Sequence, residues 1–185
     1  MMGYMLLVAG LILWSGSHWW KRLAPASRAR MGDAGKGLVA VLSLAGIVLM
    51  VLGYRWAPAD QIWPQSGGMV HLNNLLMVLV FYLFAASGMK TRATAIVRHP
   101  QLWGVRLWAI AHLLVNGTLA DLILFGGLLV WAQMSVALIN RAAPYWDKPR
   151  ITASTGKEIG ALVGAVIAMG AVGWIHGLVG PWPFG

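Results

Sequence analysis

The chain has 185 residues, of which 59 % are hydrophobic and only 10 % are charged, and its mean hydropathy is +0.70. Soluble domains carry about 25 % charged residues, so this chain has too few charges to cover a water-facing surface and is expected to be an integral membrane protein. The absence of cysteine excludes disulfides, thiolate metal sites, covalently attached c-type haem and cysteine nucleophiles.

The formal net charge of +9 has an uneven distribution along the chain. Most of the basic residues gather in three alternating loops: Lys21, Arg22, Arg28, Arg30 and Lys36; Lys90, Arg92 and Arg98; and Arg141, Lys148, Arg150 and Lys157. This distribution is the positive-inside bias of membrane proteins, and it predicts that the three loops are cytoplasmic. The charge therefore indicates orientation in a lipid bilayer, and we expect no nucleic-acid partner.

Six apolar runs approach the roughly 20 residues that a helix needs to cross a bilayer. In chain order they cover residues 3–20, 37–53, 70–87, 102–115, 118–140 and 159–178. The fourth run is short and joins the fifth through Asn116 and Gly117, a polar turn that predicts a helical hairpin. The predicted fold is an all-α six-transmembrane helical bundle of one domain over residues 1–185. Both termini lie on the outer, periplasmic side of the inner membrane.

Small residues and tryptophans mark two further features of these runs. Gly160, Gly164 and Ala168 repeat at four-residue spacing in the sixth run and predict a close contact with a neighbouring helix. Four tryptophans fall inside predicted spans, where they either pack in the core or form the walls of a flat pocket. They are Trp14, Trp108, Trp131 and Trp174.

The five histidines are the main candidates for chemistry. His18 ends the first span, His71 opens the third, His99 opens the fourth, and His176 lies near the end of the sixth. For a histidine at a span end, a hydrogen bond to backbone or water is the ordinary role. His112 lies inside the fourth span, and an ionisable side chain within a bilayer is by default a candidate functional residue.

Helical spacing places other polar and aromatic groups beside these histidines. Trp108, His112 and Asn116 lie on one stripe at four-residue spacing. We expect Asn116 to hydrogen-bond to one ring nitrogen of His112 and so to fix its tautomer, as outer-shell partners of ligating histidines do. Trp14 likewise precedes His18 by four residues.

Imidazoles without neighbouring acids or thiolates suit haem iron, which takes histidine as an axial ligand. They suit zinc less well, since zinc sites commonly use three convergent protein ligands. No two carboxylates share a span at helical spacing, which argues against acid–base hydrolysis. The residues by themselves leave open a haem site, a site for a quinone, a lipid or another small apolar molecule, and a purely structural role.

The segments "RHPQLWG", "WAIAH" and "NG", together with "SGSHWWKRL" near the N-terminus, resemble the NnrU family of bacterial membrane proteins and its plant relative, the cis-ζ-carotene isomerase. The resemblance covers nearly the whole chain. It implies a role in the nitrogen-oxide metabolism of denitrifying bacteria. Through the plant relative it also implies haem b bound by histidines, with haem-dependent cis–trans isomerisation as the first activity to consider. The implied ligand positions fall on His18 and His112, and Arg98, His99 and Pro100 match the shared motif.

Membrane methyltransferases that use S-adenosylmethionine provide a second resemblance. They contain an "RHP…G" segment at the start of a late helix, and Arg98, His99, Pro100 and Gly104 fit that pattern. In those enzymes a paired-glutamate motif usually follows, whereas here the tail offers only Glu158. Under either resemblance, Arg98 and His99 are expected to bind an anionic group, a haem propionate or a cofactor carboxylate.

The depth of each histidine in the membrane limits which two of them could ligate one haem iron. His18 lies three residues before Lys21, about 5 Å along a helix, whereas His112 lies fourteen residues beyond Arg98, about 21 Å. Two ligands of one iron need similar depth. The implied pair therefore requires the fourth helix to begin in the cytoplasm, with Arg106 near the membrane edge. If it does not, His71 is the better-placed partner of His112.

Overall fold

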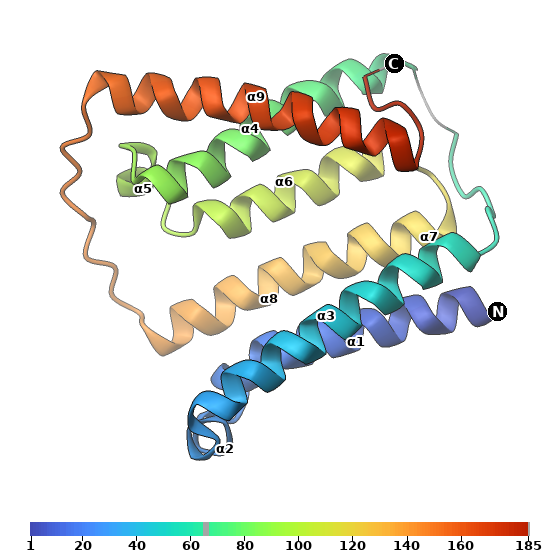
Figure 1. Cartoon of the computed structure of the whole chain (residues 1–185), viewed down its shortest axis with the longest axis horizontal. Coiled ribbons are helices and arrows are strands. Elements are labelled where there is room, and N and C mark those ends of the chain that lie inside the picture. The colour runs from blue at the N-terminus through green and yellow to red at the C-terminus, as the bar shows by residue number, and fades with distance from the viewer. Residues whose placement is uncertain (65–66, 185) are drawn as a thin grey trace. The chain divides into compact units, whose positions relative to one another are not determined.

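The computed structural model describes residues 1–64 and 67–184, and these are predominantly helical (Figure 1). The helices in chain order are α1 (Met2–Leu23), α2 (Pro25–Arg30), α3 (Gly32–Trp56), α4 (Gly67–Met89), α5 (Ala93–Ile96), α6 (Pro100–Val115), α7 (Leu119–Asp121), the π-helix η1 (Leu122–Gly126), α8 (Gly127–Ala142) and α9 (Thr155–Val179). The described residues contain no strand beyond one isolated antiparallel bridge between Gln61 and Thr118. Every predicted apolar run is a helix, which confirms the all-α class.

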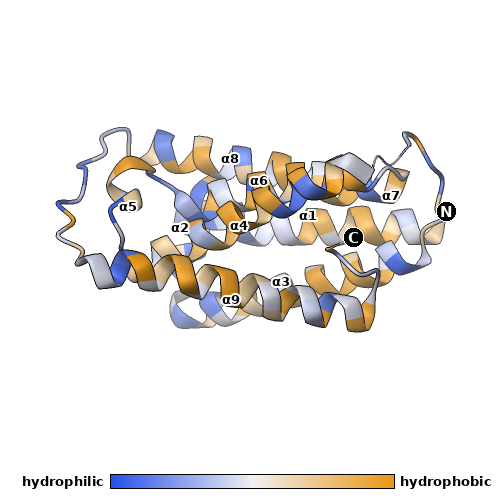
Figure 2. Ribbon diagram, turned by 90° about the horizontal axis from the view of Figure 1, so that it is seen from above, coloured by the Kyte–Doolittle hydropathy of each residue, from blue (hydrophilic) through white to orange (hydrophobic). Residues whose placement is uncertain are grey.

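Four helical segments of the described chain are long and apolar enough to cross a membrane: α3, α4, the segment Leu119–Ala142 and α9. In the most apolar stretch of α9 only 11 % of the residues are buried, and Figure 2 shows hydrophobic residues along much of its length. Such exposed apolar surface fits a helix that faces lipid. These four segments support the prediction of a membrane protein.

The two remaining predicted spans, α1 and α6, do not reach the same length and hydropathy. With 16 residues, α6 is about 24 Å long at the helical rise, less than the roughly 30 Å of a bilayer core. α1 has 22 residues, but its second half contains the polar residues Ser15, Ser17 and His18. The structure therefore supports four spans. The count of six spans and the outward position of both termini stay predictions.

The chain forms two compact units, each built from two separate segments. The first unit contains Met1–Trp63 and Gly117–Pro144, and the second contains Pro64–Asn116 and Tyr145–Gly185. In the first unit α1 packs along α3 and contacts α8, and in the second α4 packs against both α6 and α9. The assignment of residues 1–185 to one domain stays a prediction.

Glycines at seven-residue spacing bring the backbones of α1 and α3 into contact. A Cβ atom on Gly10 would lie 2.7 Å from the backbone nitrogen of Met50, and a Cβ on Gly53 would meet the backbone of Leu7. Gly46 faces α1 in the same way, 3.0 Å from the backbone nitrogen of Trp14. A helix pair this close leaves room for no side chain at these positions.

The close contact predicted on α9 is not formed in the described part of the chain. A Cβ on Gly164 would meet no atom within 4 Å, and one on Gly160 would be in ordinary contact with Met89 Cε at 3.4 Å. The buried side of α9 uses Ala161 and Ala165 instead. Gly104 of α6, the glycine of the "RHP…G" pattern, does have a packing role, since its Cβ would lie 2.8 Å from Phe84 Cε2 of α4.

A buried carboxyl group joins α3 to the start of α7. Asp121 is 2 % exposed, and its Oδ2 accepts hydrogen bonds from the backbone nitrogen and the hydroxyl of Thr118, at 2.8 and 2.7 Å. The Tyr54 hydroxyl donates to Oδ1 at 2.5 Å. Thr118 and Asp121 form a capping box, which satisfies free N–H groups of the helix start. Asp121 therefore has a structural partner for each oxygen.

We expect Asp121→Ala to lower the free energy of unfolding by about 3 kcal/mol, because buried donors would lose their acceptor. Tyr54→Phe removes one of these hydrogen bonds and should cost about 1 kcal/mol. Thermal denaturation in detergent measures both. Asp60→Ala is the matched control, since Asp60 accepts from Tyr4 at an exposed position and its loss should change stability by less than about 0.5 kcal/mol. Equal melting temperatures for all three variants would contradict this role of Asp121.

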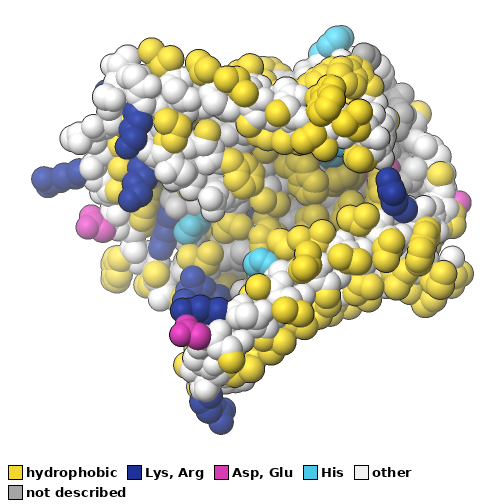
Figure 3. Space-filling view, in the orientation of Figure 1, with side chains coloured by type: hydrophobic (Ala, Val, Ile, Leu, Met, Phe, Trp, Pro, Cys, Tyr) yellow, Lys and Arg dark blue, Asp and Glu magenta, His cyan; other side chains and the backbone are white. Residues whose placement is uncertain are grey.

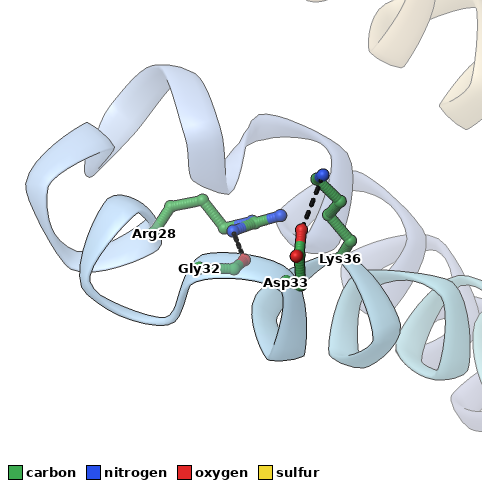
Figure 4. A network of polar contacts seen from close by, with 4 residues as sticks. All are labelled: Arg28, Gly32, Asp33 and Lys36. Carbon is green, nitrogen blue, oxygen red and sulfur yellow. Dashed lines mark hydrogen bonds and ion pairs between the residues drawn. The ribbon is translucent and has the colours of Figure 1, made fainter.

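The turn between α2 and α3 carries basic residues at an exposed position (Figure 4). Arg28 Nη1 donates to the Gly32 carbonyl at 3.0 Å, and Lys36 pairs with Asp33 at 2.7 Å. Both members of the ion pair are largely exposed, so it contributes little to stability. Gly32 has a φ of +51°, a conformation that glycine adopts without strain. Dark-blue Lys and Arg side chains lie around α2 in Figure 3, a charge that is complementary to anionic lipid headgroups.

Candidate functional site

The imidazole of His18 is fixed by the backbone of its own helix. Its Nδ1 lies 2.8 Å from the carbonyl oxygen of Trp14, four residues earlier in α1. A carbonyl only accepts hydrogen bonds, so Nδ1 carries the proton and donates, and in the neutral ring Nε2 holds the lone pair. Nε2 makes no hydrogen bond to the described residues. This tautomer presents Nε2 as the nitrogen that can ligate a metal.

Two indole rings enclose His18. Its ring centroid lies 4.0 Å from that of Trp14 on α1 and 5.3 Å from that of Trp131 on α8, and the two indoles are themselves 5.4 Å apart. Trp14 Nε1 and Trp131 Nε1 are buried, and neither has a hydrogen-bond acceptor among the described residues. A buried donor without a partner costs about 1–3 kcal/mol. Two such donors beside one histidine suit a ligand that brings its own acceptor atoms.

Neighbouring helices hold this cluster in place. From α3, Gly46 lets the backbone approach Trp14, and Ser43 Oγ lies 3.1 Å from Ser17 Oγ. From α8, Ser135 Oγ accepts from Trp19 Nε1 at 2.9 Å and donates to the carbonyl of Trp131 at 2.7 Å. The glycine contact between α1 and α3 thus positions the tryptophan that orients His18.

His112 of α6 repeats the arrangement in the second unit. Its Nδ1 lies 2.9 Å from the carbonyl oxygen of Trp108, four residues earlier, and the two rings are 4.9 Å apart. By the same reasoning Nδ1 donates, and the lone pair of the neutral ring is on Nε2. The predicted stripe of Trp108, His112 and Asn116 is therefore present on α6.

The role expected for Asn116 was wrong. Its Nδ2 donates to the backbone carbonyl of His112 at 2.9 Å rather than to the ring, so it caps the end of α6. The carbonyl of Trp108 fixes the tautomer instead. Asn116 lies beyond the last turn, where the free carbonyls of a helix need donors, and such a carbonyl competes with the ring for its amide.

The "RHP" segment forms the start of α6. Pro100 is the first residue of the helix, where its missing N–H costs nothing, and the His99 carbonyl accepts from Trp103 N at 3.0 Å. Arg98 and His99 are half-buried, and their expected anion-binding role stays a prediction. Gly104 packs on Phe84, so this glycine serves the contact between α4 and α6.

The other histidines have different surroundings. His71, at the start of α4, is exposed. His176 Nδ1 lies 2.8 Å from the carbonyl of Pro181, near the end of α9. His18 belongs to the first unit, while His71 and His112 belong to the second, and the choice of partner for His112 stays a prediction.

A family model described as NnrU protein matches residues 6–183. The chain belongs to the NnrU family. No curated protein and no solved structure matches it. The NnrU match spans both units and all five histidines, so the resemblance carried by "RHPQLWG" and "WAIAH" is confirmed over nearly the whole chain.

Imidazole is the side-chain donor that His18 and His112 would offer to a haem iron. Among the described residues no group of three or more His, Asp or Glu side chains comes together to hold a free metal ion. Haem needs fewer protein ligands than a free metal ion, because the porphyrin supplies four nitrogen ligands and the chain would supply only one or two side chains. His18 and His112, each with its Nδ1 hydrogen-bonded to a carbonyl, have the orientation that outer-shell partners give to ligating imidazoles.

Proposed function

We propose that this member of the NnrU family is a multipass inner-membrane protein that binds haem b through histidine, with His18 in the first unit and His112 in the second as the candidate ligands. The observation that carries the proposal is the repeated tryptophan–histidine arrangement. Both rings donate Nδ1–H to the carbonyl of the tryptophan four residues earlier. That hydrogen bond fixes the orientation and the tautomer of the ring, and Nε2 is the nitrogen through which it would bind iron.

The protein's own residues would determine what the haem does. Bound haem b supplies a redox-active iron. Trp14 and Trp131 surround His18 with apolar surface and limit the access of water, while their buried N–H groups offer hydrogen bonds to a polar atom of a ligand. Such a setting suits an apolar substrate or a quinone. Cis–trans isomerisation of a polyene and a step in nitrogen-oxide metabolism are the activities that the family suggests.

An absorption spectrum of the detergent-purified protein, oxidised and then reduced, tests the proposal. A Soret band with sharp α and β bands on reduction would support histidine-ligated haem b, and the haem content per chain counts the sites. Two haems per chain would assign His18 and His112 to separate irons. A colourless protein that binds S-adenosylmethionine would replace the proposal with methyl transfer through Arg98, His99 and Pro100.

Six spans with both termini outside complete the proposal, and cysteine labelling tests this topology in a chain that has no natural cysteine. Gly67→Cys at the start of α4 should react with an impermeant maleimide from the periplasm. Tyr145→Cys, at a position 93 % exposed in the loop before α9, should react only from the cytoplasm. Gly164→Cys is the control, because its open position on α9 faces lipid and should stay unlabelled. Labelling of the first two from the same side would contradict the topology.

A further inference from the structure

Arg106 is a buried arginine without a partner for much of its guanidinium. It lies in α6 and is 8 % exposed, and its Nε and Nη2 atoms are buried with no hydrogen-bond acceptor among the described residues. The two acids of the same unit are engaged elsewhere or exposed. Glu158 Oε1 accepts from the backbone nitrogen of Arg92 at 2.9 Å, and Asp147 lies in the exposed loop before α9.

The contact that the structure does give Arg106 is too weak to explain its burial. The guanidinium carbon lies 4.8 Å from the centre of the Trp103 ring, a cation–π contact that contributes roughly 0.5–2 kcal/mol. Burying an unpaired charge costs several kcal/mol, and the cost is higher within a bilayer. A buried arginine with two orphaned nitrogen atoms, in a helix proposed to span the membrane, therefore indicates an anionic partner from outside the chain.

We propose that Arg106 binds an oxyanion carried by a membrane-embedded ligand. This inference rests on the proposed function in naming the ligand: the oxyanion is a propionate of the haem that His112 ligates. The planar guanidinium suits a carboxylate, because two of its N–H groups can donate in parallel to the two oxygens. The orphaned Nε and Nη2 lie on one edge of that plane, as such a pair requires.

The position of Arg106 on α6 agrees with this role. It precedes His112 by six residues, which is about 9 Å along the helix axis and about 120° around it. Ala109, fully buried, lies between the two at three-residue spacing. Gly104, which marks the side that packs on α4, lies far around the helix from Arg106. Arg106 and His112 thus occupy neighbouring sides of one helix. Arg106 can then bind the propionate while His112 ligates the iron of the same haem.

Haem and its dimethyl ester provide a direct test, since the ester keeps the porphyrin and iron but has no carboxylate. Full-length apoprotein in detergent is titrated with each, and the dissociation constants are read from the Soret band. We expect the wild-type protein to bind haem b at least tenfold more tightly than the ester. Arg106→Gln should abolish this preference, and Arg106→Lys should keep part of it. Arg150→Gln, at an exposed loop position, is the matched control and should behave like the wild type.

A lipid phosphate is the other source of an oxyanion, and native mass spectrometry distinguishes it. If wild-type protein retains an anionic phospholipid that Arg106→Gln loses, while the preference for haem over its ester is unchanged, the oxyanion is the phosphate and the propionate assignment is wrong. If Arg106→Gln and Arg106→Met both elute as folded monodisperse protein and bind haem, ester and phospholipid like the wild type, the inference is overturned. Absence of haem binding in the wild type refutes the proposed function instead, and the phospholipid measurement then still decides the role of Arg106.

Discussion

His112→Ala should purify without the haem absorption bands, with haem affinity lowered more than about 100-fold, because loss of a ligand exceeds the 10- to 100-fold effect of losing an outer-shell partner. Titration of haem b into the apoprotein, followed at the Soret band, measures the affinity. Trp108→Phe should retain binding, since the group that orients His112 is the backbone carbonyl and not the indole. His176→Ala is the matched control, because His176 hydrogen-bonds to Pro181 near the end of α9.

The same titration chooses between the partners of His112. His18→Ala should lower affinity to a similar extent as His112→Ala if the two form the axial pair. Loss of binding in His71→Ala with retention in His18→Ala would favour the partner suggested by membrane depth. Unchanged bands in His112→Ala would remove haem ligation from α6 altogether.

Gly53→Leu should separate α1 from α3 and lower the free energy of unfolding by about 3 kcal/mol or more, the upper range for overpacking. A side chain at Gly53 would collide with the backbone of Leu7, and backbone atoms cannot move aside by changing rotamer. Thermal denaturation and size-exclusion chromatography in detergent measure the effect. Gly16→Leu on α1 and Gly37→Leu on α3 are the controls, since neither position has an atom within 4 Å.

The controls should be as stable as the wild type or slightly more so, because leucine is a better helix former than glycine. Similar destabilisation of Gly53→Leu and the controls would show that glycine serves the helix itself and not the contact between helices. Gly46→Leu should add a second effect, a weaker haem affinity, since Gly46 faces the backbone of Trp14 beside His18.

The sequence predicted the helices well, because long apolar runs and a proline at a helix start leave few alternatives. It also predicted the pairing of Trp14 with His18 and of Trp108 with His112, since both lie within one helix at a fixed four-residue spacing. Contacts between distant segments were less predictable. Trp131 was recognised only as a tryptophan within a span, and nothing in the local pattern indicates that it packs on His18 of another helix.

The glycines show the same limit. The four-residue repeat on α9 predicts a close contact there, yet the glycines that bring backbones together are seven residues apart on α1 and α3. Either spacing places small residues on one side of a helix, and only the partner helix decides which side is used. The sequence shows only where Arg106 lies along α6, because its lack of hydrogen-bond acceptors follows from its burial in the fold.

The π-helical turn Leu122–Gly126 separates the carboxyl anchor Asp121 from Trp131. A π turn holds one residue more than an α turn, so it accommodates an added residue, about 100° of rotation, without turning the flanking residues out of register. A relative with one residue fewer at this point can form both contacts through a continuous α-helix. We therefore expect members of this family to tolerate the insertion or deletion of one residue within this helix, so that an alignment gap there would not indicate a loop.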